Sequence, residues 1–220
     1  MDKRICVTLL PAFLACGCVA SSNFYSGRTL EEGKYSAGFA ADDIALSSTD
    51  PDLSATKTKP FLPSFSGAYG LPARLEIGAR YYPISFFELT LRHQLNPRSF
   101  EYIDASLNLH FAHLIGGYSS LKYGVTISKN IHEIEPYVHY SAYSYLGATE
   151  EIFDGTFVSG SEARFINNNR VVGFGIALPM RNAKLYPEAN YQYFGGDVAH
   201  GLWHFGIGIR VYPNQGPKND

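Results

Sequence analysis

Residues 203–211 read Trp-His-Phe-Gly-Ile-Gly-Ile-Arg-Val, and this stretch decides the fold. Large apolar side chains occupy every second position from Trp203 to Val211, while His204, two glycines and Arg210 stand between them. Successive side chains of a β-strand point to opposite faces, so this period of two predicts a strand with one apolar and one polar face. The stretch is also about as long as a tilted strand that crosses a bilayer.

The same alternation recurs along most of the chain. We expect about ten strands, within a range of roughly eight to twelve, because three of the segments (34–42, 62–70 and 133–145) alternate less strictly. The segments are 34–42, 62–70, 73–82, 87–92, 103–111, 121–128, 133–145, 172–178, 185–193 and 203–211.

The connections between these segments alternate in length. The two longest, 45–61 and 146–168, both follow odd-numbered strands, whereas the links after even-numbered strands are short turns. Transmembrane barrels combine short periplasmic turns with longer outside loops. The pattern therefore predicts an all-β fold, an antiparallel up-and-down transmembrane β-barrel.

Composition narrows the possible classes of protein. The chain has 220 residues, of which 45% are hydrophobic, 15% aromatic and 17% charged, with a net charge of −2. The apolar content excludes a disordered chain, and the net charge argues against a nucleic-acid partner held by a basic surface. We expect no metal site and no cofactor. A soluble lipocalin-like barrel or sandwich is the alternative fold.

The charged residues of the strands concentrate on the face opposite the apolar one. In a membrane barrel this face lines the interior, where an unpaired charge costs several kcal/mol, so balanced charges are expected. The predicted lumen network has five bases and five acids: Arg74, Glu76, Arg80, Glu88, Arg92, Asp104, Lys122, Glu135, Glu188 and Arg210.

The N-terminus reads as an export signal. A basic start precedes an eleven-residue apolar run, 5–15, which is too short to span a bilayer as a helix. The Cys16-Gly17-Cys18 sequence that follows resembles a bacterial lipoprotein processing site. Cys18 is favoured for lipidation because a glycine precedes it and a Ser-rich stretch follows; Cys16 is the second candidate, and an ordinary cleaved signal peptide is the alternative.

These features give a domain organisation. We expect a signal peptide over 1–18, a linker over 19–33, a barrel over 34–212 and a C-terminal tail over 213–220. All three cysteines lie in the leader, so the body has no disulfide framework and no cysteine nucleophile.

Over roughly residues 34–212 the chain resembles the bacterial outer-membrane β-barrel proteins, in particular small barrel lipoproteins known only by that architecture. The resemblance rests on the alternation, the glycine-rich inward positions and the terminal strand 204–211. It implies an outer-membrane location, membrane lipid around the barrel, folding by the barrel-assembly machinery and, with a lipidated cysteine, an N-terminal anchor on the periplasmic side.

One constellation has the composition of a catalytic site. His139 and Ser141 share the inward face of one strand with Glu135, and a Ser–His pair oriented by a carboxylate is the logic of an activated nucleophile. A His-x-Ser strand also resembles the outer-membrane lipid A deacylases, in which the pair faces lipid and Asn follows the Ser. Here Ala142 follows, and Tyr140 rather than His139 lies on the apolar face. We therefore expect a hydrogen-bonded lumen rather than an enzyme.

Three functions follow from the sequence. The first is a barrel with a charge-filled lumen and a structural or interaction role through its extracellular loops. The second is a narrow channel for small solutes, although about eight strands are just filled by side chains and open pores need about sixteen. The third is an acyl hydrolase that uses Ser141 and His139.

Overall fold

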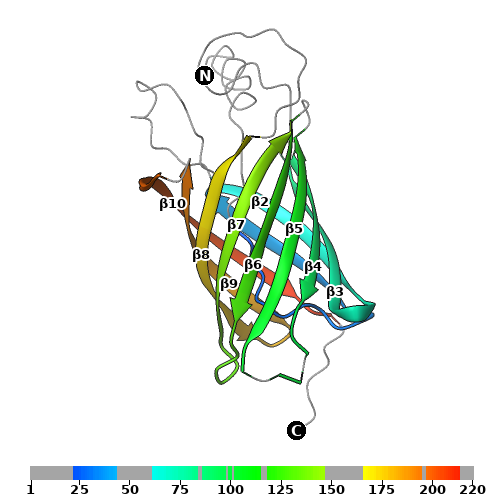
Figure 1. The fold of residues 1–220 in the computed structure, drawn as a ribbon. Coiled ribbons are helices and arrows are strands. Elements are labelled where there is room, and N and C mark those ends of the chain that lie inside the picture. The colour runs from blue at the N-terminus through cyan, green and yellow to red at the C-terminus, as the bar shows by residue number, and fades with distance from the viewer. Residues whose placement is uncertain are drawn as a thin grey trace, which may run out of the picture.

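Ten antiparallel strands close into a barrel in the computed structural model of the chain (Figure 1). The structure describes residues 22–43, 61–83, 86–97, 99–100, 102–114, 118–146, 166–194 and 197–213. Among them, no helix is both long enough and apolar enough to cross a membrane.

The strands run from 8 to 15 residues. They are β1 (Tyr35–Asp43), β2 (Phe61–Leu71), β3 (Leu75–Tyr82), β4 (Phe86–Gln94), β5 (Asp104–Leu114), β6 (Tyr118–Ser128), β7 (Glu135–Leu146), β8 (Ile166–Met180), β9 (Ala183–Phe194) and β10 (Asp197–Val211).

Each strand pairs with its neighbours in sequence, and β1 closes the barrel against β10 in a register that runs from Ala37↔Val211 to Asp42↔Gly206. The predicted up-and-down topology and the count of ten strands are therefore confirmed. The expected start of the seventh strand at residue 133 is wrong, because Ile131 and Ile134 pair as an isolated bridge and close a tight turn before Glu135.

The two ends of the barrel differ. At one end, here called the turn end, β1 begins, β10 ends, and short connections such as Arg181-Asn182 join even to odd strands. The opposite end, the loop end, carries the connections 44–60 and 147–165, which lie outside the described residues, as do most of the two predicted long loops.

The faces of the strands are those of a membrane barrel. Along β10, Phe205 and Ile207 are 55% and 48% exposed, whereas Arg210 is 7% exposed. The same arrangement holds around the barrel, with apolar side chains outside and polar ones inside, as predicted. In a closed sheet, alternate side chains of each strand point into the interior or out from the wall. The interior is therefore polar only if every strand places its polar residues on the inner face.

Candidate functional site: the filled barrel interior

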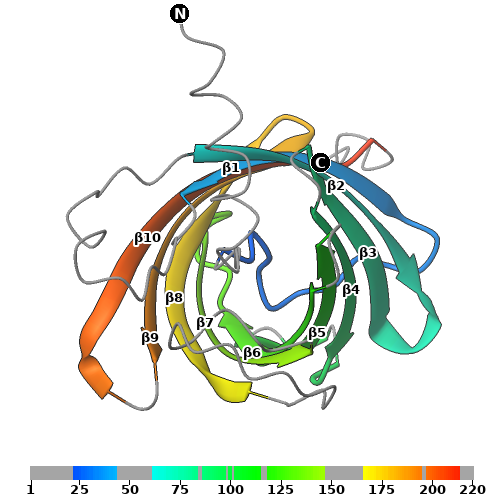
Figure 2. The same cartoon turned by 90° about the horizontal axis from the view of Figure 1, so that it is seen from above.

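Residues 22–30 do not lie outside the barrel but run through its interior (Figure 2). Every residue of this segment except Arg28 is buried. From Lys34 at the turn end, the chain turns back into the barrel and reaches Ser22, beside Arg80 of β3. We call residues 22–30 the plug. These residues fall in the predicted linker 19–33, and they have no periodicity that would predict a plug.

The barrel wall holds the plug mainly through its backbone. Glu188 of β9 accepts hydrogen bonds from the Asn23 and Phe24 N–H groups at 2.7 and 2.8 Å. Phe24 has a positive φ of 54°, a conformation in which successive N–H groups can converge on one anion. Arg80 donates to the carbonyl oxygens of Ser22 and Asn23 at 3.1 and 2.8 Å.

The same pattern continues toward the turn end. The Gly27 N–H donates to Ser128 Oγ at 2.9 Å, and the Leu30 N–H donates to Glu76 Oε2 at 2.7 Å. Arg92 donates to the Ser26 carbonyl oxygen. A buried backbone group without a partner costs about 1–3 kcal/mol, so these wall residues make burial of the segment possible.

Tyr25 lies among three guanidinium groups. The Cζ atoms of Arg92 and Arg210 are each 4.7 Å from its ring centroid, and that of Arg80 is 5.7 Å away. Glu76 accepts from Arg92 at 3.1 Å and from Arg210 at 2.8 Å. One carboxylate thus pairs with two cations, which also contact the aromatic ring of the plug.

The inward glycines of β10 make room for Phe24. A Cβ atom on Gly206 or Gly208 would lie 2.7 or 2.9 Å from the nearest atom of the Phe24 ring. Phe24 packs there with Ala40, Tyr137 and other buried residues. The glycine-rich inward positions seen in the sequence therefore have a packing role. This role becomes clear only from the position of the plug in the folded barrel.

Nine of the ten residues of the predicted lumen network are buried in the interior; the tenth is Arg74. Arg74 lies in the turn Pro72–Arg74 at the turn end, where it donates to the Leu95 carbonyl oxygen at 3.1 Å. Its placement on a strand was wrong, because a short turn with positive φ at Ala73 and Arg74 replaces the first residues of that segment.

His139, Ser141 and Glu135 all face the interior, but they do not form a catalytic triad. His139 Nε2 lies 2.8 Å from Asn190 Oδ1 and 3.2 Å from Glu188 Oε1, both on β9. Glu135 instead accepts from Lys184 and Ser128, at 2.8 and 2.7 Å. Among the described residues, no hydrogen bond joins Ser141 to His139, and Glu188, which contacts His139, binds the plug. Cys16 and Cys18 lie outside the described residues.

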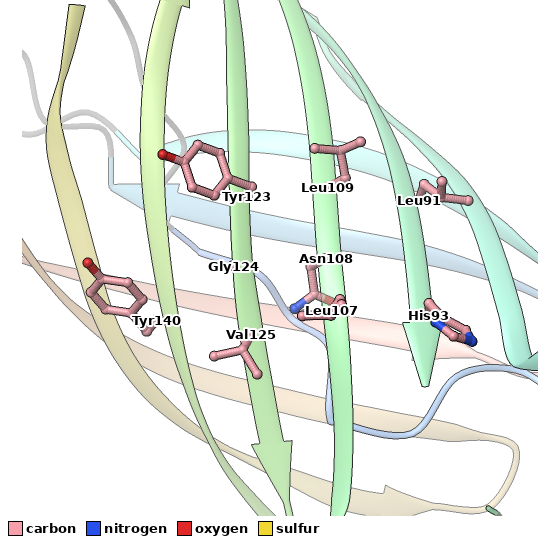
Figure 3. A pocket seen from close by; sticks show the side chains of 9 residues that line it. All are labelled: Leu91, His93, Leu107, Asn108, Leu109, Tyr123, Gly124, Val125 and Tyr140. Carbon is pink, nitrogen blue, oxygen red and sulfur yellow. The ribbon is translucent and has the colours of Figure 1, made fainter. Parts of the chain in front are cut away.

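The outer surface is apolar where the inner one is charged. A groove of about 450 Å³ crosses the outer surface from β4 to β7, and Figure 3 shows the side chains that line it. Leucines of β4 and β5 line it together with Tyr123, Val125 and Tyr140, and His93 lies at its edge. Large exposed apolar side chains around a closed barrel with buried charges inside are the reverse of a soluble protein. The chain therefore has the architecture of a transmembrane β-barrel, with an apolar outer face and a charged interior.

No family model and no curated protein sequence matches this chain. Among solved structures, Yersinia pestis Ail in a phospholipid bilayer nanodisc is 16% identical, covers 82% of this chain and 99% of its own, and has a TM-score of 0.37. The N-terminal β-barrel domain of Pseudomonas aeruginosa OprF is 12% identical, with coverages of 82% and 99% and a TM-score of 0.35. A de novo designed transmembrane β-barrel is 11% identical, with 84% and 98% coverage and a TM-score of 0.36. Similarities at this level carry no information about function.

Proposed function

We propose that this protein resides in the bacterial outer membrane as a barrel closed by its own plug, and that it has a structural or interaction role. One observation supports this most strongly: the charges of the lumen wall are used to bind the backbone of residues 22–30. A channel would keep such charges in contact with water and solute. Here Glu76, Arg92 and Glu188 each bind the plug.

In this proposal the turn end faces the periplasm, and the long loops face the cell exterior. Membrane lipid covers the apolar outer face, including the groove of Figure 3. Contacts with partners outside the cell would then use the loops at 44–60 and 147–165, because lipid covers the outer face of the strands.

We also propose a lipid anchor at Cys18 or Cys16, as a state that alternates with the docked plug for a geometric reason. Cys18 precedes Ser22 by four residues, which span at most about 14 Å. Ser22 is buried inside the barrel, and the plug enters from the turn end. Acyl chains cannot occupy a charged lumen, so a docked plug and an anchor in the inner leaflet of the outer membrane compete. Labelling cells with a radioactive fatty acid, with Cys18→Ser and Cys16→Ser as controls, tests the anchor.

Conductance in planar bilayers tests the closure. We expect the wild-type barrel to be silent, and Gly27→Ala to open it, because a Cβ on residue 27 would lie 2.2 Å from the Asp104 carbonyl oxygen. Gly67→Ala is the matched control, since its added Cβ has no neighbour closer than 3.9 Å. A steady open state in the wild-type protein would refute closure and favour the small-solute channel.

The acyl hydrolase remains the weaker candidate, because His139 pairs with Glu188 and Asn190 rather than with Ser141. Lipid A from cells that overexpress the protein should be unchanged. Altered lipid A that reverts with Ser141→Ala would establish the enzyme instead.

A further inference from the structure

The barrel wall binds the plug chiefly through groups that every peptide carries. Side chains of the wall accept from the backbone N–H groups of residues 23, 24, 27, 29 and 30, and donate to the carbonyl oxygens of residues 22, 23 and 26. They belong to Glu76, Arg80, Arg92, Gln94, Ser128 and Glu188. Backbone groups are the same in every sequence, so these contacts suit peptide segments of many sequences.

The wall does not bind the side chain of Asn23. The Asn23 N–H group donates to Glu188 at 2.7 Å, and the Asn23 carbonyl oxygen accepts from Arg80 at 2.8 Å. Both polar atoms of the side-chain amide, in contrast, are buried without a hydrogen-bond partner among the described residues. Unsatisfied buried polar atoms weaken the docked state. The position therefore accepts other side chains, and an apolar one of similar size removes this cost.

Four other positions of the plug do depend on their side chains. Phe24 fills the space beside the inward glycines of β10, and the Tyr25 ring lies against guanidinium groups of the wall. A Cβ atom on Gly27 would lie 2.2 Å from the Asp104 carbonyl oxygen. Arg28 pairs with the Asp104 carboxylate at 3.0 Å at the turn end, where its side chain is 44% exposed. The wall therefore selects two adjacent aromatic residues, one spacer residue, glycine and a basic residue.

We propose that the lumen binds a segment of another polypeptide with this pattern, and that the plug is a tethered ligand of the same site. The proposal rests on closure of the lumen by the plug and on the anchored state, in which the plug is undocked. In that state Glu76, Arg92 and Glu188 lose the backbone groups to which they are hydrogen-bonded. A segment that enters from the turn end replaces those groups, so that the buried charges are hydrogen-bonded again.

Competition from the plug decides which chains show this binding. A tethered segment has an effective concentration on the order of millimolar, so a free peptide binds only weakly to the wild-type chain. Two full-length variants weaken the plug and leave the wall unchanged. Gly27→Ala introduces the clash with Asp104, and Phe24→Ala removes the ring that packs against β10. A shift in gel mobility on boiling verifies that each variant has a folded barrel.

Fluorescence anisotropy of labelled nine-residue peptides, added to the purified, folded chains in detergent, tests the proposal. The first peptide has the sequence of residues 22–30 with Asn23→Leu. The second keeps only Phe24, Tyr25, Gly27 and Arg28 and has alanine elsewhere, and the third is a scrambled form of the first. We expect the first two to bind the Gly27→Ala and Phe24→Ala chains about 10- to 100-fold more tightly than the wild type. The scrambled peptide should bind these variants at least about 10-fold more weakly than the first two.

Glu188→Gln distinguishes binding in the lumen from adsorption to the apolar outer face. Combined with Gly27→Ala, it removes one acceptor for a peptide N–H group and should weaken the binding of the first two peptides about 10-fold. An affinity that Glu188→Gln leaves unchanged, equal binding of the scrambled peptide, or no binding to the folded Gly27→Ala and Phe24→Ala chains would overturn the proposal.

Failure of the alanine-based peptide alone would also overturn the proposal, because the lumen would then be specific for its own plug. A wild-type chain that binds the first two peptides as tightly as the variants do would show that the plug is undocked. That result would refute closure instead, so the two failures are distinguishable.

Discussion

Glu188 joins the plug to the barrel wall through several hydrogen bonds. Its carboxylate accepts from two successive plug N–H groups and from the Tyr137 hydroxyl at 2.7 Å, and it lies beside His139 and Asn190. A carboxylate is an acceptor with two oxygens, so no neutral side chain replaces all of these bonds.

Glu188→Gln should therefore loosen the plug without unfolding the barrel. The amide nitrogen cannot accept, so one of the two plug N–H groups loses its partner, at a cost of about 1–3 kcal/mol. We expect hydrogen exchange at Asn23 and Phe24 to accelerate about 10- to 100-fold. The Gly33 N–H, which donates to the Gly70 carbonyl oxygen, is the internal control and should keep its rate. Unchanged exchange at both plug amides would contradict this account.

Tyr25 should contribute through its ring rather than its hydroxyl. Tyr25→Phe keeps the ring between Arg92 and Arg210, whereas Tyr25→Leu keeps apolar volume but loses the cation–π contacts. We expect Tyr25→Phe to unfold like the wild type and Tyr25→Leu to lose about 1–2 kcal/mol, measured by urea unfolding in lipid vesicles. Equal losses in both variants would show that the hydroxyl matters instead.

At the scale of the element, alternate residues of each strand meet different requirements: the outward residues are apolar, and the inward residues fit the contents of the lumen. The outward residues of β10 are apolar and exposed, and its inward glycines accommodate the plug. The pleat separates the two sets, so a substitution on one face is expected to leave the other face unchanged.

The stability cost of a charged residue on the outward face of β10 should depend on its depth in the bilayer. Ile207→Arg lies in the middle of the outward row of β10, and Val211→Arg lies at the end of the strand. An arginine on the lipid face costs about 2–4 kcal/mol at the bilayer centre and about 0–1 near its surface. Unfolding in vesicles should show the larger loss for Ile207→Arg. Similar losses at both positions would indicate that the strand does not cross a bilayer.

At the scale of the whole molecule, the closed barrel buries nine of the ten predicted lumen charges and exposes apolar side chains on its outer face, an arrangement suited to a lipid environment. Closure also removes every sheet edge, so that each strand has two neighbours.

This architecture predicts the behaviour of the intact protein in a cell fractionation. The chain should appear in the outer-membrane fraction, and an unboiled sample should migrate differently from a boiled one in a denaturing gel, because a closed barrel resists detergent until it is heated. A soluble band with the same mobility before and after boiling would mean that the apolar face is a core, as in a lipocalin-like protein.

The sequence by itself determined the barrel. Strict alternation in the segments that form β3, β5 and β10 specifies an apolar and a polar face. This alternation is a local property, because each strand carries it in its own residues. The same alternation separated the charged residues from the apolar ones, although the turn at Arg74 escaped it, because positive φ at two non-glycine residues has no reliable signature in sequence.

Only the tertiary structure decided what fills the barrel and which groups meet. The plug has no periodicity, because its conformation is imposed by acceptors and donors that lie far away in the chain; Asn23 and Glu188 are 165 residues apart. For the same reason, the sequence could only place Glu135 on the same inward face as His139, whereas closure of the barrel brings Glu188 from another strand to the His139 ring. A strand's own sequence specifies its faces, but the partners across a lumen are set by the closure of all ten strands.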